Sequence, residues 1–253
     1  MNRAEILAEL LRLSHALGHP PHPLAILAEG NTSAKLSADS FLVKASGANL
    51  ASLREADVVE CRGEALLTTL LLRNRISDAE VEAALLASRV DSNSKKPSVE
   101  TLFHAWLLTL PGIEFVGHAH APAVNSLLCS SLAREFAEKR IFPDEIVCCD
   151  VASVFVPYTD PGLRLAQAIR ARTEVFVRTF QRPPRVILLE NHGIIALGRT
   201  ADAVLAALLM AEKAAGIWLG SAALGGPVFL SPEHVGRVAN RPDEALRRKS
   251  LKL

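Results

Sequence analysis

Aromatic residues and net charge are both scarce in this chain of 253 residues. Only 5% of the residues are aromatic, and 28 basic residues are balanced by 27 acidic ones, which leaves a net charge of +1 at pH 7. Proteins that bind nucleic acids need a basic surface, often with aromatic side chains on which bases stack. We therefore expect no nucleic-acid partner.

Long apolar runs and paired cysteines are also lacking. No uninterrupted apolar run approaches the roughly 20 residues of a membrane-spanning helix. The first 17 residues contain Glu5 and Glu9, which do not fit the apolar core of a signal peptide. None of the four cysteines lies in a C-x-x-C pair, so a zinc ribbon or a thioredoxin-like site is not indicated. We expect a cytoplasmic protein with reduced thiols and no membrane partner.

Helical and strand patterns alternate along the chain, and 49% of the residues are hydrophobic. Spacing and capping signals predict helices over residues 2–17, 77–88, 98–110, 122–130, 161–180 and 201–223. Apolar stretches predict strands within 24–37, 40–47, 57–63, 113–121, 145–150 and 153–158, and a hairpin over 185–198 that bends at 191–193. This mixture indicates one α/β domain with a substantial core.

Two histidines, His118 and His120, stand one residue apart on a predicted strand. Side chains at positions i and i+2 of a strand point to the same face. Both imidazoles can therefore reach one metal ion. The alternative is that each is an ordinary hydrogen-bonded histidine in the interior or at the rim of the fold.

Glu100 and His192 could complete such a site. One carboxylate and three imidazoles suit Zn²⁺ or another divalent cation such as Mn²⁺ or Co²⁺. Taken singly, Glu100 could be a first-turn acid that the helix dipole favours, and His192 could belong to a tight turn. His104, one helical turn after Glu100, is a rival ligand, but its apolar neighbours Phe103 and Trp106 favour a core position.

Short turns rich in glycine, asparagine and serine occur at residues 29–33 and 44–50. Turns of this kind can present backbone N–H groups and hydroxyls to a phosphate or carboxylate, and a serine at a helix N-terminus can add another donor. They are also the normal composition of hairpin turns. The candidate anion-binding residues are Asn31, Ser46, Gly47 and Ser98.

Tyr158 is the only tyrosine of the chain, in the stretch "VFVPYTDPG". Its phenol is a candidate general acid. A tyrosine at a turn after a strand is the alternative.

In their order along the chain, these motifs resemble the class II aldolase/adducin family. The resemblance covers roughly residues 3–220 and leaves 221–253 as a helical C-terminal tail of the single domain 1–253. It rests on Gly30-Asn31-Thr32-Ser33, Ser46-Gly47, Ser98-x-Glu100, His118-x-His120, Tyr158 and Asn191-His192-Gly193. It implies a three-layer α/β/α fold around a mainly antiparallel sheet, assembled as a homotetramer.

The resemblance also implies roles for the site residues. The metal ligands would be His118, His120 and His192, with Glu100 approaching the metal as well. Substrate phosphate would be bound by Asn31, Ser46, Gly47 and Ser98. Tyr158, from a neighbouring subunit, would serve in proton transfer.

The implied activity is that of a metal-dependent aldolase that cleaves or forms a C–C bond in a ketose or ketose 1-phosphate through a metal-stabilised enediolate. Glu100 would shuttle the proton. Alternatives on the same metal site are 4-epimerisation, dehydration or decarboxylation of a sugar phosphate. A non-catalytic scaffold like adducin is disfavoured because all three metal histidines are present.

The wording of "KASGANL", "PSVET" and "VPYTDPG" is similar to the aldolase part of bifunctional rhamnulose-phosphate aldolase/alcohol dehydrogenases. Because no dehydrogenase domain follows in the sequence, we do not expect the second activity. Two positions depart from the phosphate-binding pattern. Val99 replaces a second serine, and Glu29 adds a negative charge before the glycine turn. Both argue against a phosphorylated substrate.

Overall fold

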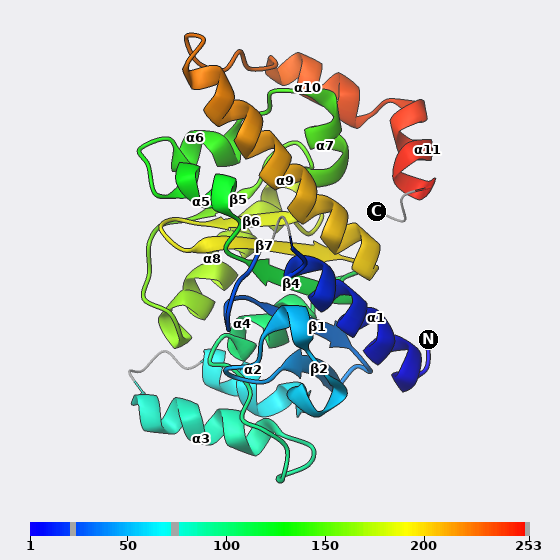
Figure 1. Ribbon diagram of the computed structural model, residues 1–253, viewed down its shortest axis with the longest axis vertical. Coiled ribbons are helices and arrows are strands. Elements are labelled where there is room, and N and C mark those ends of the chain that lie inside the picture. The colour runs from blue at the N-terminus through cyan, green and yellow to red at the C-terminus, as the bar shows by residue number, and fades with distance from the viewer. Residues whose placement is uncertain (21–23, 72–75, 251–253) are drawn as a thin grey trace.

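A seven-stranded sheet forms the centre of the fold, with helices on both faces (Figure 1). The computed structural model describes residues 1–20, 24–71 and 76–250. The strand order is β3-β2-β1-β4-β7-β6-β5, and neighbouring strands are antiparallel except for the parallel pair β5 and β6. The predicted three-layer arrangement around a mainly antiparallel sheet is confirmed. The strands are β1 (Asn31–Lys35), β2 (Ser40–Lys44), β3 (Val58–Arg62), β4 (Phe115–Ala119), β5 (Val154–Val156), β6 (Val186–Leu189) and β7 (Gly193–Gly198).

Each face of the sheet has its own hydrophobic core, because successive residues of a strand point to opposite sides. In β6, Val186 and Leu188 join one core, and Ile187 and Leu189 join the other. All residues of β4, β6 and β7 are buried. These central strands therefore form a rigid platform for side chains at their ends.

Helices α1 (Arg3–Leu17) and α9 (Ala201–Ala222) pack on one face of the sheet. The shorter helices around α9 are α5 (Pro122–Leu128), α6 (Ala133–Glu138) and α7 (Pro143–Cys149). The opposite core contains residues of α2 (Gly63–Leu71), α3 (Asp78–Ser88), α4 (Thr101–Leu107) and α8 (Leu163–Phe180). Two short 3₁₀ helices, η1 (Leu50–Ser52) and η2 (Glu55–Asp57), lead from β2 to β3.

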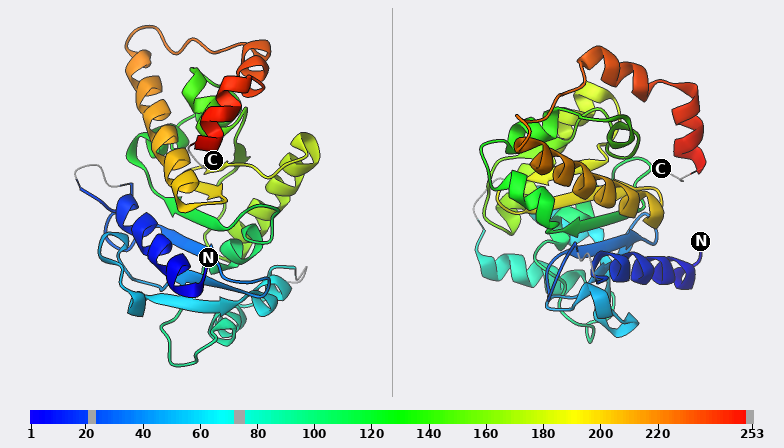
Figure 2. Two further views of the ribbon diagram at one scale, coloured as in Figure 1. Left: turned by 90° about the vertical axis from the view of Figure 1, so that its right-hand side faces the viewer. Right: turned by 45° about the horizontal axis from the view of Figure 1, so that its top comes forward.

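Two short helices form the C-terminal part of the described chain. They are α10 (Pro232–Ala239) and α11 (Pro242–Ser250). Both helices contact α7, and in both views of Figure 2 they (red) lie in the upper half of the molecule, away from the cyan helices at the bottom.

The structure contains most of the predicted helices and strands, in particular those with strong local sequence signals. The predicted helix over 77–88 is α3, and its N-cap Ser77 forms a capping box with Glu80. The predicted hairpin consists of β6 and β7, with Asn191 at a φ of 53° in the turn. Asparagine tolerates this left-handed conformation better than most residues.

The strand predicted over 145–150 is wrong, because this segment belongs to helix α7. Pro143 occupies the first turn, where its missing N–H costs no hydrogen bond, and Asp144 and Glu145 follow at the positive end of the helix dipole. The apolar residues that suggested a strand are instead buried in contacts that include α9.

The helix predicted over 98–110 is shorter than expected. It spans Thr101–Leu107, and Ser98 lies in the preceding turn, where its Oγ accepts the N–H of Glu100 at 3.3 Å. Helices α2 and α6 were not predicted; α6 has only six residues and no side-chain N-cap hydrogen bond.

Helix α9 is long and apolar enough, by length and composition, to cross a membrane. The sequence prediction missed this because Asp202, Glu212 and Lys213 interrupt its apolar runs. In the structure α9 packs on β7 and β4, and residues such as Val204 and Leu208 are fully buried there. This helix therefore serves as a core element of the fold.

Candidate metal centre

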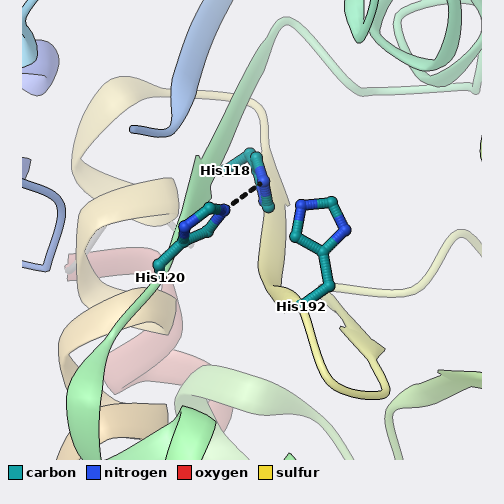
Figure 3. Close-up of side chains that lie close together, drawn as sticks. All are labelled: His118, His120 and His192. Carbon is teal, nitrogen blue, oxygen red and sulfur yellow. Dashed lines mark hydrogen bonds between the residues drawn. The ribbon is translucent and has the colours of Figure 1, made fainter. Parts of the chain in front are cut away.

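Three histidines converge at one end of the paired strands β4 and β7. His118 lies in β4, His120 directly after it, and His192 in the turn before β7. Their ring centroids are 5.0–5.1 Å apart (Figure 3). One ligand nitrogen from each ring lies within 4.8 Å of the others. The prediction that the two strand histidines share a face is confirmed, and His192, which the sequence motifs had grouped with them, lies beside them.

The ring of His118 is oriented by the backbone. Its Nδ1 lies 3.0 Å from the carbonyl oxygen of Ile194, so Nδ1 carries the proton and Nε2 offers its lone pair. That Nε2 lies 3.2 Å from the Nε2 of His120. Burial lowers the pKa of His118 to about 4, and it also lowers the pKa of His120. Burial therefore favours the neutral form of both rings, which is the form that ligates a metal.

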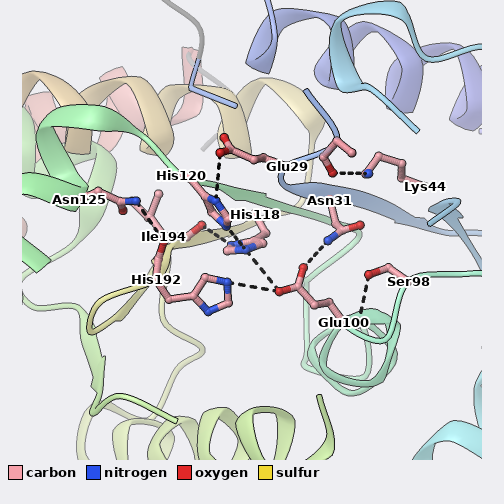
Figure 4. A network of polar contacts seen from close by, with 11 residues as sticks. Glu29, Asn31, Lys44, Ser98, Glu100, His118, His120, Asn125, His192 and Ile194 are labelled. Carbon is pink, nitrogen blue, oxygen red and sulfur yellow. Dashed lines mark hydrogen bonds and ion pairs between the residues drawn. The ribbon is translucent and has the colours of Figure 1, made fainter. Parts of the chain in front are cut away.

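The carboxylate of Glu100 lies beside the histidine cluster. Its Oε1 lies 3.4 Å from His192 Nε2 and 3.6 Å from His118 Nε2, and its Oε2 accepts a hydrogen bond from the Asn31 side chain (Figure 4). Burial raises the pKa of Glu100, but the nearby histidines outweigh this effect and lower it to about 2. Glu100 is therefore ionised at neutral pH.

This donor set fits a divalent cation. His118 Nε2 and His120 Nε2 face each other beside the largely buried Glu100 carboxylate, and one nitrogen from each of the three rings can converge on a single ion. Imidazole and carboxylate donors together suit Zn²⁺ and its first-row neighbours. The residues that would hold the ion are His118, His120 and His192, with Glu100 beside them.

Gly193 makes the close approach of the rings possible. A Cβ at this position would lie 2.5 Å from the Ala119 carbonyl oxygen, 2.9 Å from His120 Cδ2 and 3.1 Å from His118 Cε1. Real side-chain atoms do not tolerate such distances. The glycine of the Asn-His-Gly motif therefore allows the Ala119 carbonyl and the His120 ring to approach this closely.

His104, the rival ligand, lies outside the cluster. It is completely buried, stacks on Phe103 with ring centroids 4.6 Å apart, and shares a hydrogen bond of 2.7 Å between its Nδ1 and the Ser33 hydroxyl. Burial lowers its pKa to about 3. The interpretation of His104 as a core residue agrees with this position.

The predicted anion-binding residues are divided between two places. Asn31 and Ser98 are engaged with Glu100, one through the carboxylate and the other through the backbone N–H. Ser46 and Gly47 lie in an exposed turn and line a polar cavity of about 530 Å³ together with residues that include Arg54. The structure thus places only two of the four directly against the metal-binding residues.

Tyr158 is away from the histidines within one chain. Its side chain is 57% exposed, and its hydroxyl donates to Asp160 at 3.2 Å, which raises the pKa of the phenol. Its backbone N–H donates to Glu190, two residues before His192. The role predicted for Tyr158 requires a second chain and stays a prediction.

Lys44 was not singled out from the sequence, although it is only 2% exposed. Its ammonium donates to the carbonyl oxygens of Ala28 at 3.1 Å and Ala48 at 2.7 Å. Burial lowers its pKa, and the nearby Glu100 carboxylate opposes this. Lys44 therefore links, through these two hydrogen bonds, the turn that precedes Asn31 and the turn that contains Gly47. Its place at the end of a strand, directly before the Ala-Ser-Gly turn, is the only sequence signal for this role.

Comparisons with known proteins agree with this architecture. A family profile, the class II aldolase and adducin N-terminal domain, matches residues 8–219. The uncharacterized oxidoreductase YuxG of Bacillus subtilis (strain 168) is 28% identical over 182 residues. The match covers 68% of this chain and 24% of YuxG, so the chain spans about a quarter of that relative's length.

Two solved structures show the same fold. The N-terminal class II aldolase domain of a conserved protein from Thermoplasma acidophilum has a TM-score of 0.63 and 27% identity, and the match covers 81% of this chain and 91% of that one. An L-fuculose 1-phosphate aldolase has a TM-score of 0.71 and 20% identity, with 94% and 96% covered.

Proposed function

This chain belongs to the class II aldolase and adducin family, and from that premise we propose that it is a metal-dependent aldolase acting on a ketose or ketose 1-phosphate. The main support for this proposal is the largely buried Glu100 carboxylate, whose Oε1 lies 3.4–3.6 Å from two histidines of a three-histidine cluster. A Lewis acid and a proton-transfer group side by side are what reversible C–C cleavage next to a carbonyl needs.

The three histidines would hold Zn²⁺ or another divalent cation such as Mn²⁺ or Co²⁺. When bound, the cation would polarise the substrate carbonyl and offset the negative charge that develops there as the C–C bond breaks. Glu100 is the proton carrier. Asn31 holds its Oε2, Ser98 holds its backbone N–H, and Oε1 faces the histidines.

The remaining residues would bind the rest of the substrate. We assign Asn31, Ser46, Gly47 and Ser98 to its distal, anionic or hydroxylated end. Tyr158 would exchange a proton with the departing aldehyde at the site of a neighbouring subunit, in a homotetramer. The exposure of its phenol within one chain supports this assignment.

Metal analysis and two variants test the proposal. The purified protein should contain about one divalent ion per chain, and a chelator should abolish activity that Zn²⁺, Mn²⁺ or Co²⁺ restores. His118→Ala should lose the metal, whereas Glu100→Gln should keep the metal and lose turnover by ~100-fold or more. The control His234→Ala changes an exposed histidine of α10 and should alter neither.

The products separate aldol cleavage from the other reactions that the same metal site could support. Ketoses with and without a 1-phosphate should yield a three-carbon ketone and an aldehyde. An epimer, a dehydrated ketone or released carbon dioxide would replace the aldolase with the corresponding alternative. Metal-free protein that is fully active, or the absence of any bound metal, would contradict the metal-dependent mechanism itself.

A further inference from the structure

A second carboxylate, that of Glu29, lies next to the histidine cluster. Its Oε1 is 3.9 Å from His120 Nδ1, the ring nitrogen opposite the Nε2 that faces His118 (Figure 4). The register of the sheet explains this position. Asn31 of β1 pairs with His118 of β4, and continuing the antiparallel pairing past both strand ends places Glu29 opposite His120.

The turn that carries Glu29 is held at several points. Glu29 Oε2 accepts the N–H of Ile26 at 3.1 Å, and the N–H of Glu29 donates to the Ile26 carbonyl at 3.0 Å. Lys44 holds the carbonyl of Ala28 from the interior. Within this turn Leu27 has a φ of 53°, a strained conformation for a leucine that persists only where the surroundings fix it. The Glu29 carboxylate is therefore presented to His120 by a constrained turn.

The outer nitrogens of the three histidines have different surroundings. His118 Nδ1 donates to the Ile194 carbonyl, His120 Nδ1 faces the Glu29 carboxylate, and His192 Nδ1 has no partner among the described residues. A histidine that ligates a metal through one nitrogen commonly donates its other N–H to such an acceptor, which fixes the tautomer and makes the ring a stronger ligand. A carboxylate does this more strongly than a neutral carbonyl.

We propose that Glu29 is a positioning residue that accepts the Nδ1 proton of His120 and so directs the Nε2 lone pair of His120 at the metal. This role rests on the proposed metal-dependent function. It also means that the negative charge of Glu29, directly before the glycine turn, acts on His120 and not on the substrate.

Cobalt binding by Glu29→Gln tests the role. Glutamine keeps an oxygen that can accept the Ile26 N–H, so the turn is retained while the charge facing His120 is lost. We expect Co²⁺ to bind 10- to 100-fold more weakly, measured by competition with a chelator. We also expect the visible absorption bands of the Co²⁺-saturated protein to shift. The control Glu82→Gln removes a carboxylate of α3 that is paired with Lys96, and it should change neither measurement.

The outcomes separate this role from the proposed function. An unchanged Co²⁺ affinity, or weaker binding with an unchanged saturated spectrum, would refute the positioning role of Glu29. The proposed function would survive that result if His118→Ala still lost Co²⁺ binding. A wild-type protein that binds no Co²⁺ would overturn both.

Discussion

The substitution Gly193→Ala would test how tightly the histidine cluster is packed. Gly193 is not at a positive φ, so alanine does not strain the backbone there, and the effect is steric. The added methyl group would lie 2.5 Å from the Ala119 carbonyl oxygen and 2.9 Å from the His120 ring. These distances are shorter than ordinary contact by roughly 0.5–1 Å.

Both neighbours are difficult to move. Ala119 is a fully buried residue of a central strand, and the partly buried His120 ring lies against the rings of His118 and His192. Adding a methyl group to a site of this kind typically costs about 1–3 kcal/mol of folding stability. A displacement of the ring by several tenths of an ångström should also weaken metal binding by roughly tenfold or more, since ligand geometry has to be held within about 0.5 Å.

Urea unfolding of the metal-free protein measures the first effect, and Co²⁺ titration measures the second. Gly216→Ala is the matched control, because a Cβ at Gly216 in α9 would meet no atom within 4 Å. The same change should stabilise the protein there by about 0.5–1 kcal/mol, since alanine favours a helix over glycine. If Gly193→Ala had the stability and Co²⁺ affinity of the wild type, the steric reasoning would be wrong.

Two further predictions concern protons. The pKa of His104 is lowered to about 3 in the folded chain, so below pH 6.5 the unfolded chain binds one more proton than the folded chain. As the pH falls from 6.5 to 5, this difference lowers the free energy of unfolding by about 2 kcal/mol. His104→Gln should remove this loss in urea unfolding at the two pH values, and an unchanged pH slope would contradict the assignment. Tyr158→Phe should keep the bound metal and reduce turnover by ~100-fold or more, and turnover equal to the wild type would exclude the phenol as the acid.

The sequence alone determined the features that depend on local periodicity and short motifs. A strand has a period of two residues, so His118 and His120 had to share a face. The Ser77–Glu80 capping box fixed the start of α3, and the ordered motifs pointed to the family that the profile over residues 8–219 then showed. These features need no knowledge of which strands pair.

The tertiary structure decided what depends on contacts distant in sequence. Segment 145–150 has a short apolar run that suits a strand and a buried helix equally well. In the structure the segment belongs to helix α7, which packs against α9. The pairing of β1 with β4 brings Glu29 beside His120, 91 positions along the chain, and the pairing of β4 with β7 brings Gly193 against the same ring. Because strand pairing depends on the whole sheet, no local pattern could reveal that Glu29 faces a histidine.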